Sequence, residues 1–415
     1  MPDPNARQTA LLVLRRWEEG SGHIDELIAG ACGRGGVGGA DRAFVQALCL
    51  GVVRNLTLID ELIGELRKGA IKPEPHRILR LGVFQLLFLG VPDHAAINET
   101  VSLARGKAER GLVNAILRNV IRQRDLLKVI AESYEPAIRY SIPDFLYDRW
   151  LDRFGEAEAE ALAAWCGQPS DVYVRANRLQ PGAEDRVAAA EGCERVPGTG
   201  AAFFKAATLP EALLADGTCY AQDPSTELAV NLLDPQPGES ILDACAAPGG
   251  KAALIAERMG NAGKIVACDA SEHRLPRLRE NLDRLGASIA EVAAHRFGEG
   301  EPPFPAASFD RILIDAPCSN TGVLRRRADA KWRLHERVFA AMQENQLAIA
   351  TACAPLLKPG GVLVYSTCSI EPEENADAAR RIASEAGLTL DRQIECLPQR
   401  DGFDGAYAAR LVREG

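Results

Sequence analysis

Two cysteines occur in sequence settings that suit covalent chemistry better than packing. Cys318 lies in DAPCSNTG and Cys368 in STCSIEPEE, each directly after an apolar run that predicts a strand. A thiol at the carboxyl end of a strand in an open α/β sheet lies beside the ligand crevice. Buried packing is the simpler account of most of the eleven cysteines. It fits poorly for two that both end strands among small, polar and turn-forming residues.

A carboxylate stands close to the first thiol in the sequence, because Asp315 precedes Cys318 by three residues. Two thiols and a carboxylate suit covalent catalysis in which the group transferred is accepted by a carbon that is not itself nucleophilic, such as C5 of cytosine. A thiolate that adds to C6 lets C5 attack a methyl sulfonium, an acid at N3 stabilises the adduct, and a second thiol helps the release. The nucleophile must be a thiolate, and Lys251 and Lys331 are the candidate cations that would lower its pKa.

A glycine pair follows another predicted strand. In ILDACAAPGGK the strand runs into the helix KAALIAERMG, so the backbone can approach a ligand closely at the helix N-terminus. Neither GxGxxG nor GxxxxGK[ST] occurs there, which weakens a dinucleotide or triphosphate interpretation. Asp269 ends the next strand, where an acid in such folds binds ribose hydroxyls. Together these features predict an adenosine-type ligand.

The elements that position these residues follow from hydrophobic periodicity. Apolar runs at 240–244, 264–269, 309–315 and 361–368 alternate with amphipathic stretches of helix length, which predicts an α/β domain with a mostly parallel sheet. The tail DGFDGAYAARLVR predicts a closing pair of strands. From 7 to 124 the pattern is helical throughout, and from 139 to 217 it is mixed. We therefore expect three parts: an all-α bundle over 1–135, a small α+β connecting module over 136–217, and the α/β domain over 218–415.

The charge of the chain is distributed unevenly along the sequence. The 415 residues carry a formal net charge of −9, which taken alone argues against a nucleic-acid partner. Residues 1–130 carry +4 and the remainder −13, and such an asymmetry suggests modules with different partners. A solvated helix face is the alternative account of the basic run in the first part, which consists of Arg105, Lys107, Arg110, Arg118, Arg122 and Arg124. A local positive groove is expected around Lys251, Arg325–Arg327 and Lys331.

Several classes are excluded by composition. The longest apolar run, 81–91, is shorter than the roughly 20 residues of a membrane span. The N-terminus MPDPNARQTA lacks the basic and apolar regions of an export signal. The cysteines form no CxxC pair and have no histidine at zinc-ligand spacing. We expect a cytoplasmic protein with reduced cysteines and no metal.

The motifs DACAAPGGK, FDRILIDAPCSNTGV and GGVLVYSTCSIEPEEN closely resemble those of the bacterial RNA cytosine-5 methyltransferases of the RsmB (Fmu/Sun) type. DRAFVQALCLGVVRN, ILRLGVFQLLFLGVPDHAAINETV and GLVNAILRN resemble the NusB-like RNA-binding domain of that subfamily. The resemblance covers nearly the whole chain. It implies a Rossmann-like methyltransferase domain behind a NusB-like bundle, S-adenosylmethionine as the cofactor, and 16S ribosomal RNA, free or partly assembled, as the substrate of a monomeric enzyme.

The resemblance also implies roles for individual residues. The cofactor loop consists of Cys245, Ala246, Ala247, Pro248, Gly249, Gly250 and Lys251. Asp269 would lie on the ribose and Asp315 against the cofactor and the cytosine. Cys368 would be the nucleophile and Cys318 would assist release; DNA cytosine-5 methyltransferases use the PC cysteine, but here a TC cysteine is present and no ENV follows the PC motif.

One position departs from the family pattern. The family carries an acid in a GDGR-like turn after the third strand, whereas this chain has His295 and Arg296. Either Glu299 substitutes for that acid or the chain does without it.

Two other functions stay open, since a methyltransferase core does not encode its target. One is the same chemistry on tRNA or on another rRNA site. The other is a non-catalytic RNA-binding factor in ribosome assembly, against which the two strand-end thiols argue. Trp332, in DAKWR, could stack on a base or pack at a helix start.

Overall fold

The computed structural model describes residues 6–415 and divides the chain into two compact units. The first unit comprises the described residues up to Gln168 together with Arg327–Arg333, and the second comprises Pro169–Arg326 and Leu334–Gly415. This division differs from the expected three parts: residues 136–168 of the expected connecting module belong to the first unit, and its remainder, 169–217, belongs to the second. Residues 1–5, where the sequence predicts no export signal, lie outside the described residues.

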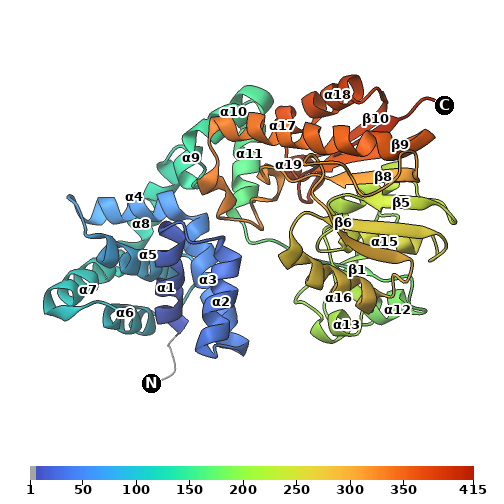
Figure 1. Ribbon diagram of the computed structural model, residues 1–415. Helices are drawn as coiled ribbons and strands as arrows, with labels where there is room; N and C mark the ends of the chain where they lie inside the picture. Colours follow the sequence, from blue (N-terminus) through green and yellow to red (C-terminus); the bar gives the residue numbers. More distant parts are fainter. Residues whose placement is uncertain (1–5) are drawn as a thin grey trace. The chain divides into compact units, whose positions relative to one another are not determined.

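The first unit is helical, as the periodicity predicts (Figure 1). Its helices are α1 (Ala6–Glu18), α2 (Ile24–Gly35), α3 (Gly39–Arg54), α4 (Leu56–Leu66), α5 (Pro73–Leu87), α6 (Asp93–Ser102), α7 (Gly106–Arg122), α8 (Arg124–Ser133), α9 (Pro136–Arg139), α10 (Asp144–Phe154) and α11 (Glu156–Gly167). Apolar residues at three- and four-residue spacing, such as Ala10, Val13 and Leu14 of α1, face one common core. Within residues 6–415 no single helix is long and apolar enough to span a bilayer; α3 and α4 pass that test only as a pair, bent by 78°.

A short segment from the far half of the sequence completes this bundle. Arg327–Arg333 belongs to the first unit and contains the 3-10 turn η4 (Ala330–Arg333). Ala328 is part of the same hydrophobic core as the helices, and Trp332 packs against it. The first unit is therefore assembled from two stretches of chain that are far apart in the sequence.

The second unit contains two sheets. The smaller one is antiparallel with the strand order β2-β3-β1-β4. Its strands are β1 (Val172–Ala176), β2 (Cys193–Arg195), β3 (Phe203–Ala206) and β4 (Cys219–Ala221), with the helices α12 (Ala183–Ala188) and α13 (Glu211–Ala215) between them. The expected pair of short strands in VPGTGAAFFKAATLP is found as β2 and β3, which pair antiparallel.

The larger sheet has seven strands in the order β10-β11-β9-β8-β5-β6-β7. Its strands are β5 (Ser240–Asp243), β6 (Lys264–Asp269), β7 (Ala290–Ala294), β8 (Phe309–Asp315), β9 (Leu357–Thr367), β10 (Thr389–Cys396) and β11 (Ala406–Val412). The five strands from β9 to β7 are parallel, whereas β11 pairs antiparallel with both β9 and β10. The mostly parallel sheet is confirmed. The tail differs from prediction, because residues 401–413 contain one strand, β11, whose antiparallel partner β10 precedes the tail and the short helix α19 (Pro398–Asp401) in the sequence.

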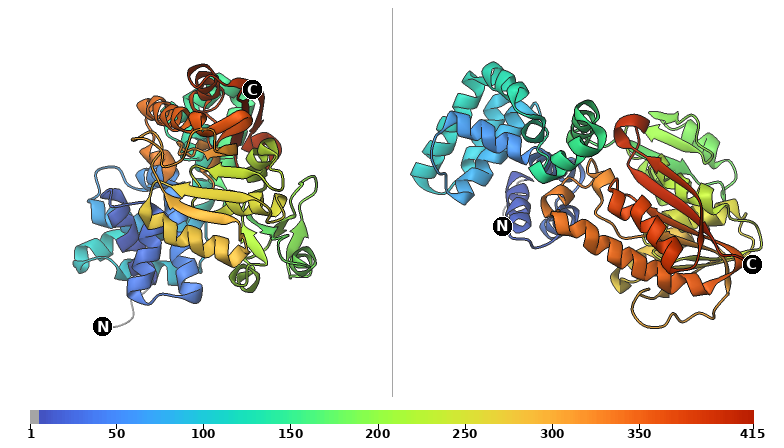
Figure 2. Two further views of the ribbon diagram at one scale, coloured as in Figure 1. Left: turned by 45° about the vertical axis from the view of Figure 1, so that its right-hand side comes forward. Right: turned by 90° about the horizontal axis from the view of Figure 1, so that it is seen from above.

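Helices cover both faces of this sheet (Figures 1 and 2). They are α14 (Glu227–Leu233), α15 (Gly250–Arg258) and α16 (Leu275–Leu285) on one face, and α17 (Glu336–Cys353) and α18 (Ala376–Glu385) on the other. Alternate strand residues enter the two cores: Ile241 faces the first set of helices and Leu242 the second. Burial on both faces explains the apolar runs of the central strands β5, β6, β8 and β9.

The strand order reverses between β5 and β8. The chain proceeds from β5 to β6 and β7 on one side, then returns to add β8 and β9 on the other. In open α/β sheets the ligand crevice lies at the carboxyl ends of the strands on either side of such a switch point. Asp243 ends β5 and Asp315 ends β8, so both carboxylates belong to this edge.

Candidate active site

The glycine turn after β5 begins helix α15, as expected. Gly249 has a φ of +107°, which favours glycine, and Gly250 is the first residue of the helix. A Cβ on Gly250 would come within 2.7 Å of the Tyr220 ring. The loop is closed on itself and on β6 by two backbone hydrogen bonds: Gly249 N–H donates to Ala246 O and Ala246 N–H donates to Cys268 O, each at 2.7 Å.

Asp269, at the end of β6, holds this loop in place. Its buried carboxylate accepts hydrogen bonds from the backbone N–H of Ala247 at 3.2 Å and of Ser271 at 2.9 Å, and from Arg274 at 3.1 Å. Three donors leave part of the acceptor capacity of a carboxylate unused. The sequence-predicted acid is therefore beside the predicted loop, and it has room for one further donor.

Lys251 and Asp315 form an ion pair that joins α15 to the end of β8. The Lys251 Nζ lies 2.6 Å from Asp315 Oδ2, and Ser366 Oγ donates to Asp315 Oδ1 at 3.1 Å. Burial lowers the pKa of Lys251, but Asp315 and the nearby Cys368 raise it more, so the ammonium stays charged. Asp315 is about one-third exposed, at 34 % of its side chain, so its carboxylate can meet a ligand.

The two predicted thiols meet directly. Cys318 Sγ and Cys368 Sγ are 3.1 Å apart, although the residues are 50 positions apart in the sequence. Cys368 also contacts Asn320 Oδ1 at 3.4 Å. The contact arises because β8 and β9 are neighbouring parallel strands, in which Asp315 lies opposite Ser366. All eleven cysteines are free.

The two thiols differ in their surroundings. Cys318 is 8 % exposed, while Cys368 is half-buried. The contact with the Cys368 sulfur, burial and the Glu374 carboxylate raise the pKa of Cys318 well above its ordinary value. Cys368 instead lies within the field of the Lys251 ammonium. Cys318 is thus held as a neutral thiol, and Cys368 is the more accessible sulfur with a cation beside it.

Asp243 is a residue of this site that the sequence reasoning did not include. It is fully buried at the end of β5, and no side chain of residues 6–415 donates a hydrogen bond to its carboxylate. Burial and the nearby Asp315 raise the pKa of Asp243 to about 7, against the opposing effects of Lys251 and the backbone N–H of Cys245. Its place in DACAAPGGK was visible in the sequence, but its burial was not. A cationic ligand group at this edge would satisfy it, so the residues present fit S-adenosylmethionine, which carries a sulfonium and an ammonium.

His295 and Arg296 stand after β7, where the family usually carries an acidic residue. His295 follows β7; its Nε2 is buried without a partner in the described part of the chain, and burial lowers the pKa of its imidazole. Glu299 is exposed and lies 3.6 Å from Arg296. Among residues 6–415, no hydrogen bond or ion pair joins the Glu299 side chain to the cofactor loop.

Four of the side chains expected to form a positive groove are engaged with other groups of the protein. Arg325 pairs with Asp171 at 2.9 Å, and Arg326 contacts both Asp223 and Asp404. Lys251 is committed to Asp315. Lys331 is 1 % exposed and its Nζ donates to Arg54 O at 2.9 Å, so it is not the cation beside the thiols. Arg325, Arg326, Lys251 and Lys331 thus have different partners, although three of these residues lie close together in the sequence.

Trp332 packs in the helical unit rather than standing free for a base. Its Nε1–H donates to Val53 O at 2.9 Å, and its ring lies against the core of the helices. The packing account is the one that the structure supports.

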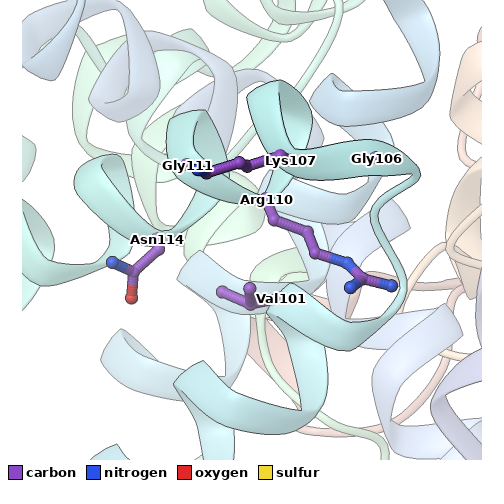
Figure 3. Close-up of a pocket in the computed structure, with 6 residues that line it drawn as sticks. All are labelled: Val101, Gly106, Lys107, Arg110, Gly111 and Asn114. Carbon is purple, nitrogen blue, oxygen red and sulfur yellow. The ribbon is translucent and has the colours of Figure 1, made fainter.

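The predicted basic residues of the helical unit are mostly exposed. Five of them are exposed, namely Arg105, Lys107, Arg110, Arg118 and Arg122, while Arg124 pairs with Asp93. Lys107, Arg110 and Asn114 of α7 line an open cavity of about 480 Å³ whose remaining lining is Val101, Gly106 and Gly111 (Figure 3). Among residues 6–415 no group of three or more metal-ligating side chains occurs.

The sheet order, the glycine turn after β5 and the carboxylates at the switch point define a Rossmann-like methyltransferase, preceded by a helical unit. Residues 230–412 match the family described as 16S rRNA methyltransferase RsmB/F, and residues 4–122 match the NusB family. The chain belongs to the family of the ribosomal RNA small subunit methyltransferases B, which confirms the resemblance seen in the motifs.

Individual relatives support this membership along about 90% of the chain. The ribosomal RNA small subunit methyltransferase B of Shewanella oneidensis is 35% identical over 403 residues, covering 90% of this chain and 91% of its own. That of Vibrio cholerae is 36% identical over 414 residues, with 90% of each chain covered. A solved structure of a methyltransferase homologue from Pyrococcus horikoshii is 28% identical, with a TM-score of 0.56, and covers 67% of this chain and 97% of its own.

Proposed function

We propose that this protein transfers a methyl group from S-adenosylmethionine to C5 of a cytosine in 16S ribosomal RNA, through a bond between Cys368 Sγ and C6 of the base. The observation that carries the proposal is the pair of sulfurs 3.1 Å apart at the ends of β8 and β9. The Lys251–Asp315 ion pair and the buried Asp243 carboxylate lie at the same edge. Relatives at about 35% identity over the same length carry the name of ribosomal RNA small subunit methyltransferases.

Three side chains of the candidate site have separate roles in the proposed reaction. Cys368 adds to C6 as a thiolate, which makes C5 nucleophilic. Asp315, held by Lys251 and Ser366, accepts a hydrogen bond from the exocyclic amine of the cytosine. After C5 has been methylated, water takes up the C5 proton, the electrons of that C–H bond restore the C5–C6 double bond, and the C6–S bond breaks to return Cys368 as a thiolate. Cys318, held as a neutral thiol in contact with that sulfur, assists this release by donating a hydrogen bond to the departing thiolate.

S-adenosylmethionine supplies an electrophilic methyl group when it is bound. The loop 245–251 would hold it, with Asp269 at the ribose and Asp243 and Asp315 facing its positive charges. Asp269 supports this role by fixing the loop through the Ala247 N–H while keeping spare acceptor capacity.

RNA would meet the helical unit through its exposed cations. Arginine and lysine side chains bind phosphates without regard to sequence, so they supply affinity while the site supplies the chemistry. The cavity whose lining includes Lys107 and Arg110 is one place where a phosphate group would meet a cation. We propose a monomer that works in the cytoplasm without a metal.

Two cysteine variants test the mechanism. Cys368→Ala should abolish transfer of tritium from labelled S-adenosylmethionine to 16S ribosomal RNA, because no sulfur is left to activate the base. Cofactor binding, measured by calorimetry, should survive. Cys318→Ala should trap a covalent protein–RNA adduct, seen as a slow band in denaturing gels. An adduct formed by Cys368→Ala instead would exchange the two roles.

The rival functions give different outcomes in the same assay. A non-catalytic assembly factor would bind 16S ribosomal RNA and transfer no label in any assembly state of the RNA. An enzyme for tRNA would label tRNA and leave 16S ribosomal RNA unlabelled. The two thiols in contact favour the enzyme, since a binding module has no use for them.

A further inference from the structure

A buried carboxylate lies directly behind the two thiols. Glu374, the last residue of the 3-10 turn η6 (Pro372–Glu374), is 0 % exposed. It accepts four hydrogen bonds: from Ser319 N–H at 2.8 Å, from Ser369 Oγ at 2.6 Å, from Gln346 Nε2 at 3.2 Å and from Ser319 Oγ. Burial raises the pKa of Glu374, while these bonds oppose the increase. Four donors around an acceptor-only group are what a buried carboxylate anion requires.

The donors are the immediate neighbours of the reactive residues. Ser319 follows Cys318, and Ser369 follows Cys368. One carboxylate therefore binds both cysteine loops at the position next to the sulfur. Gln346 on α17 extends the support, because it also donates to Pro317 O at 3.0 Å and accepts from the Tyr365 hydroxyl at 2.8 Å.

The two loops also contact each other directly. Gly322 N–H donates to Cys368 O at 3.0 Å, and Ile370 N–H donates to Thr321 Oγ1 at 3.1 Å. The approach is so close that a Cβ on Gly322 would lie 2.7 Å from Cys368 O. The hydroxyls of Ser319 and Ser369 also lie 3.2 Å apart. Glu374 adds to these direct contacts a shared acceptor that binds both serines, one residue beyond each cysteine.

We propose that Glu374 is a positioning residue that sets the register of the Cys318 and Cys368 loops and so brings the two sulfurs into contact. It touches neither sulfur nor, in the proposed chemistry, the base. A carboxylate can hold both loops because each oxygen accepts from more than one donor, which a neutral amide cannot do in the same geometry. The contact with Cys368 and burial are the larger causes of the raised pKa of Cys318. The charge of Glu374 raises this pKa further and favours the neutral thiol. The consequence for methyl transfer rests on the proposed function; the thiol geometry does not.

The contact between the sulfurs can be measured without any RNA. Diamide oxidises two adjacent thiols to a disulfide and takes up the two hydrogens and two electrons itself. The full chain would be treated with diamide, and the Cys318–Cys368 disulfide followed by mass spectrometry of peptides. Glu374→Gln should slow its formation about tenfold or more, because the sulfurs lose their fixed approach. The charge of Glu374 is also lost, so the pH profile of the reaction should move to lower pH.

A matched control is available in the same unit. Glu227 is a buried glutamate that accepts hydrogen bonds from Ala201 N–H and Arg258, both at 2.6 Å, and from Gly200 N–H at 3.2 Å. Glu227→Gln should form the disulfide at the wild-type rate with the wild-type pH profile. Ser369→Ala, which removes one donor and leaves the carboxylate, should slow the reaction less than Glu374→Gln.

Two results would overturn the assignment. One is a wild-type rate in Glu374→Gln. The other is a slow rate with an unmoved pH profile, which would mean that the substitution only loosens the fold. Methyl transfer is the second arm: kcat should fall about tenfold in Glu374→Gln at unchanged KM for S-adenosylmethionine. If the disulfide results hold and the wild type transfers no methyl group, the proposed function fails and the register assignment stands.

Discussion

The carboxylate of Asp243 is the residue whose ionisation should control cofactor binding. Its pKa of about 7 means that it titrates near neutral pH, and the cofactor is a cation. Affinity for S-adenosylmethionine should therefore rise up to about tenfold between about pH 6 and about pH 8, as the carboxylate ionises. Asp243→Asn should bind more weakly at pH 8 and lose this pH dependence. Titration calorimetry at both pH values measures it.

Asp310 provides the control for that experiment. It lies near the start of β8, away from the carboxyl ends of the strands, where it pairs with Lys358 at 2.8 Å and accepts from Ser240 N–H. Asp310→Asn should keep the pH dependence of cofactor affinity. An unchanged pH dependence in Asp243→Asn would remove Asp243 from the cofactor site.

Residue types reveal some of the site and conceal the rest. Cys318, Cys368 and the 245–251 loop could be predicted because their chemistry shows in the letters and in their places at strand ends. Glu374 could not, because EPEEN contains three glutamates and only packing distinguishes them. Glu373 is half-buried, whereas Glu374 is fully buried among donors from two other loops. Such a role depends on contacts between residues far apart in the chain.

At the scale of elements, the helical unit depends for part of its packing on the segment Arg327–Arg333, which lies within the methyltransferase part of the sequence. Asp329 accepts from Ile24 N–H at 3.2 Å at the start of α2, and Lys331 and Trp332 donate to the last turn of α3. Arg327 follows Cys318 by only nine positions along the chain. Helical propensity gave no sign of this insertion, since the segment has no periodicity of its own.

Lys331 makes the docking of this segment sensitive to pH. Burial lowers its pKa to about 7, whereas in the unfolded chain it lies near 10.4. Between these values the unfolded chain binds a proton that the folded chain does not, so the free energy of unfolding should rise with pH. The slope is at most about 1.4 kcal/mol per pH unit. Lys331→Met should abolish this contribution, as seen in urea unfolding between about pH 7 and pH 9.

The exposed Lys128 of α8 supplies the matched substitution. Lys128→Met should leave the pH dependence of unfolding as it is in the wild type. If Lys331→Met and the wild type showed the same slope, the buried side chain would not be titrating, and its hydrogen bond to Arg54 O would have to hold it charged.

The central strands of the seven-stranded sheet could be predicted from the sequence more readily than the pairing of its edge strands. The four apolar runs coincide with β5, β6, β8 and the inner part of β9, because strands buried on both faces must be apolar throughout. The closing pair was misplaced because β10 is an edge strand. Most of its residues are exposed or half-buried, so Thr389–Cys396 carries little hydrophobic signal.

For the whole molecule, the net charge of −9 is the sum of a basic N-terminal part and an acidic remainder, and we expect only the basic part to bind RNA phosphates. Deleting residues 1–130 would be a poor test, because it removes the backbone groups of Ile24, Val53 and Arg54 that hold the segment 327–333. Charge reversal leaves those backbone groups in place. Lys107→Glu/Arg110→Glu should weaken binding to 16S ribosomal RNA and reduce the slope of log K against log salt by about 1 for each phosphate that α7 no longer binds.

The comparison must separate local binding from overall charge. Arg380→Glu/Arg392→Glu changes the net charge equally at two exposed positions of the second unit, on α18 and β10. If phosphates bind α7, filter binding across a range of KCl concentrations should show a reduced slope for the α7 pair and a nearly unchanged slope for the control, because screened charges beyond about 10 Å contribute little. Equal reductions in both double variants would mean that the total charge acts on the RNA. The basic run of α7 would then be a solvated helix face.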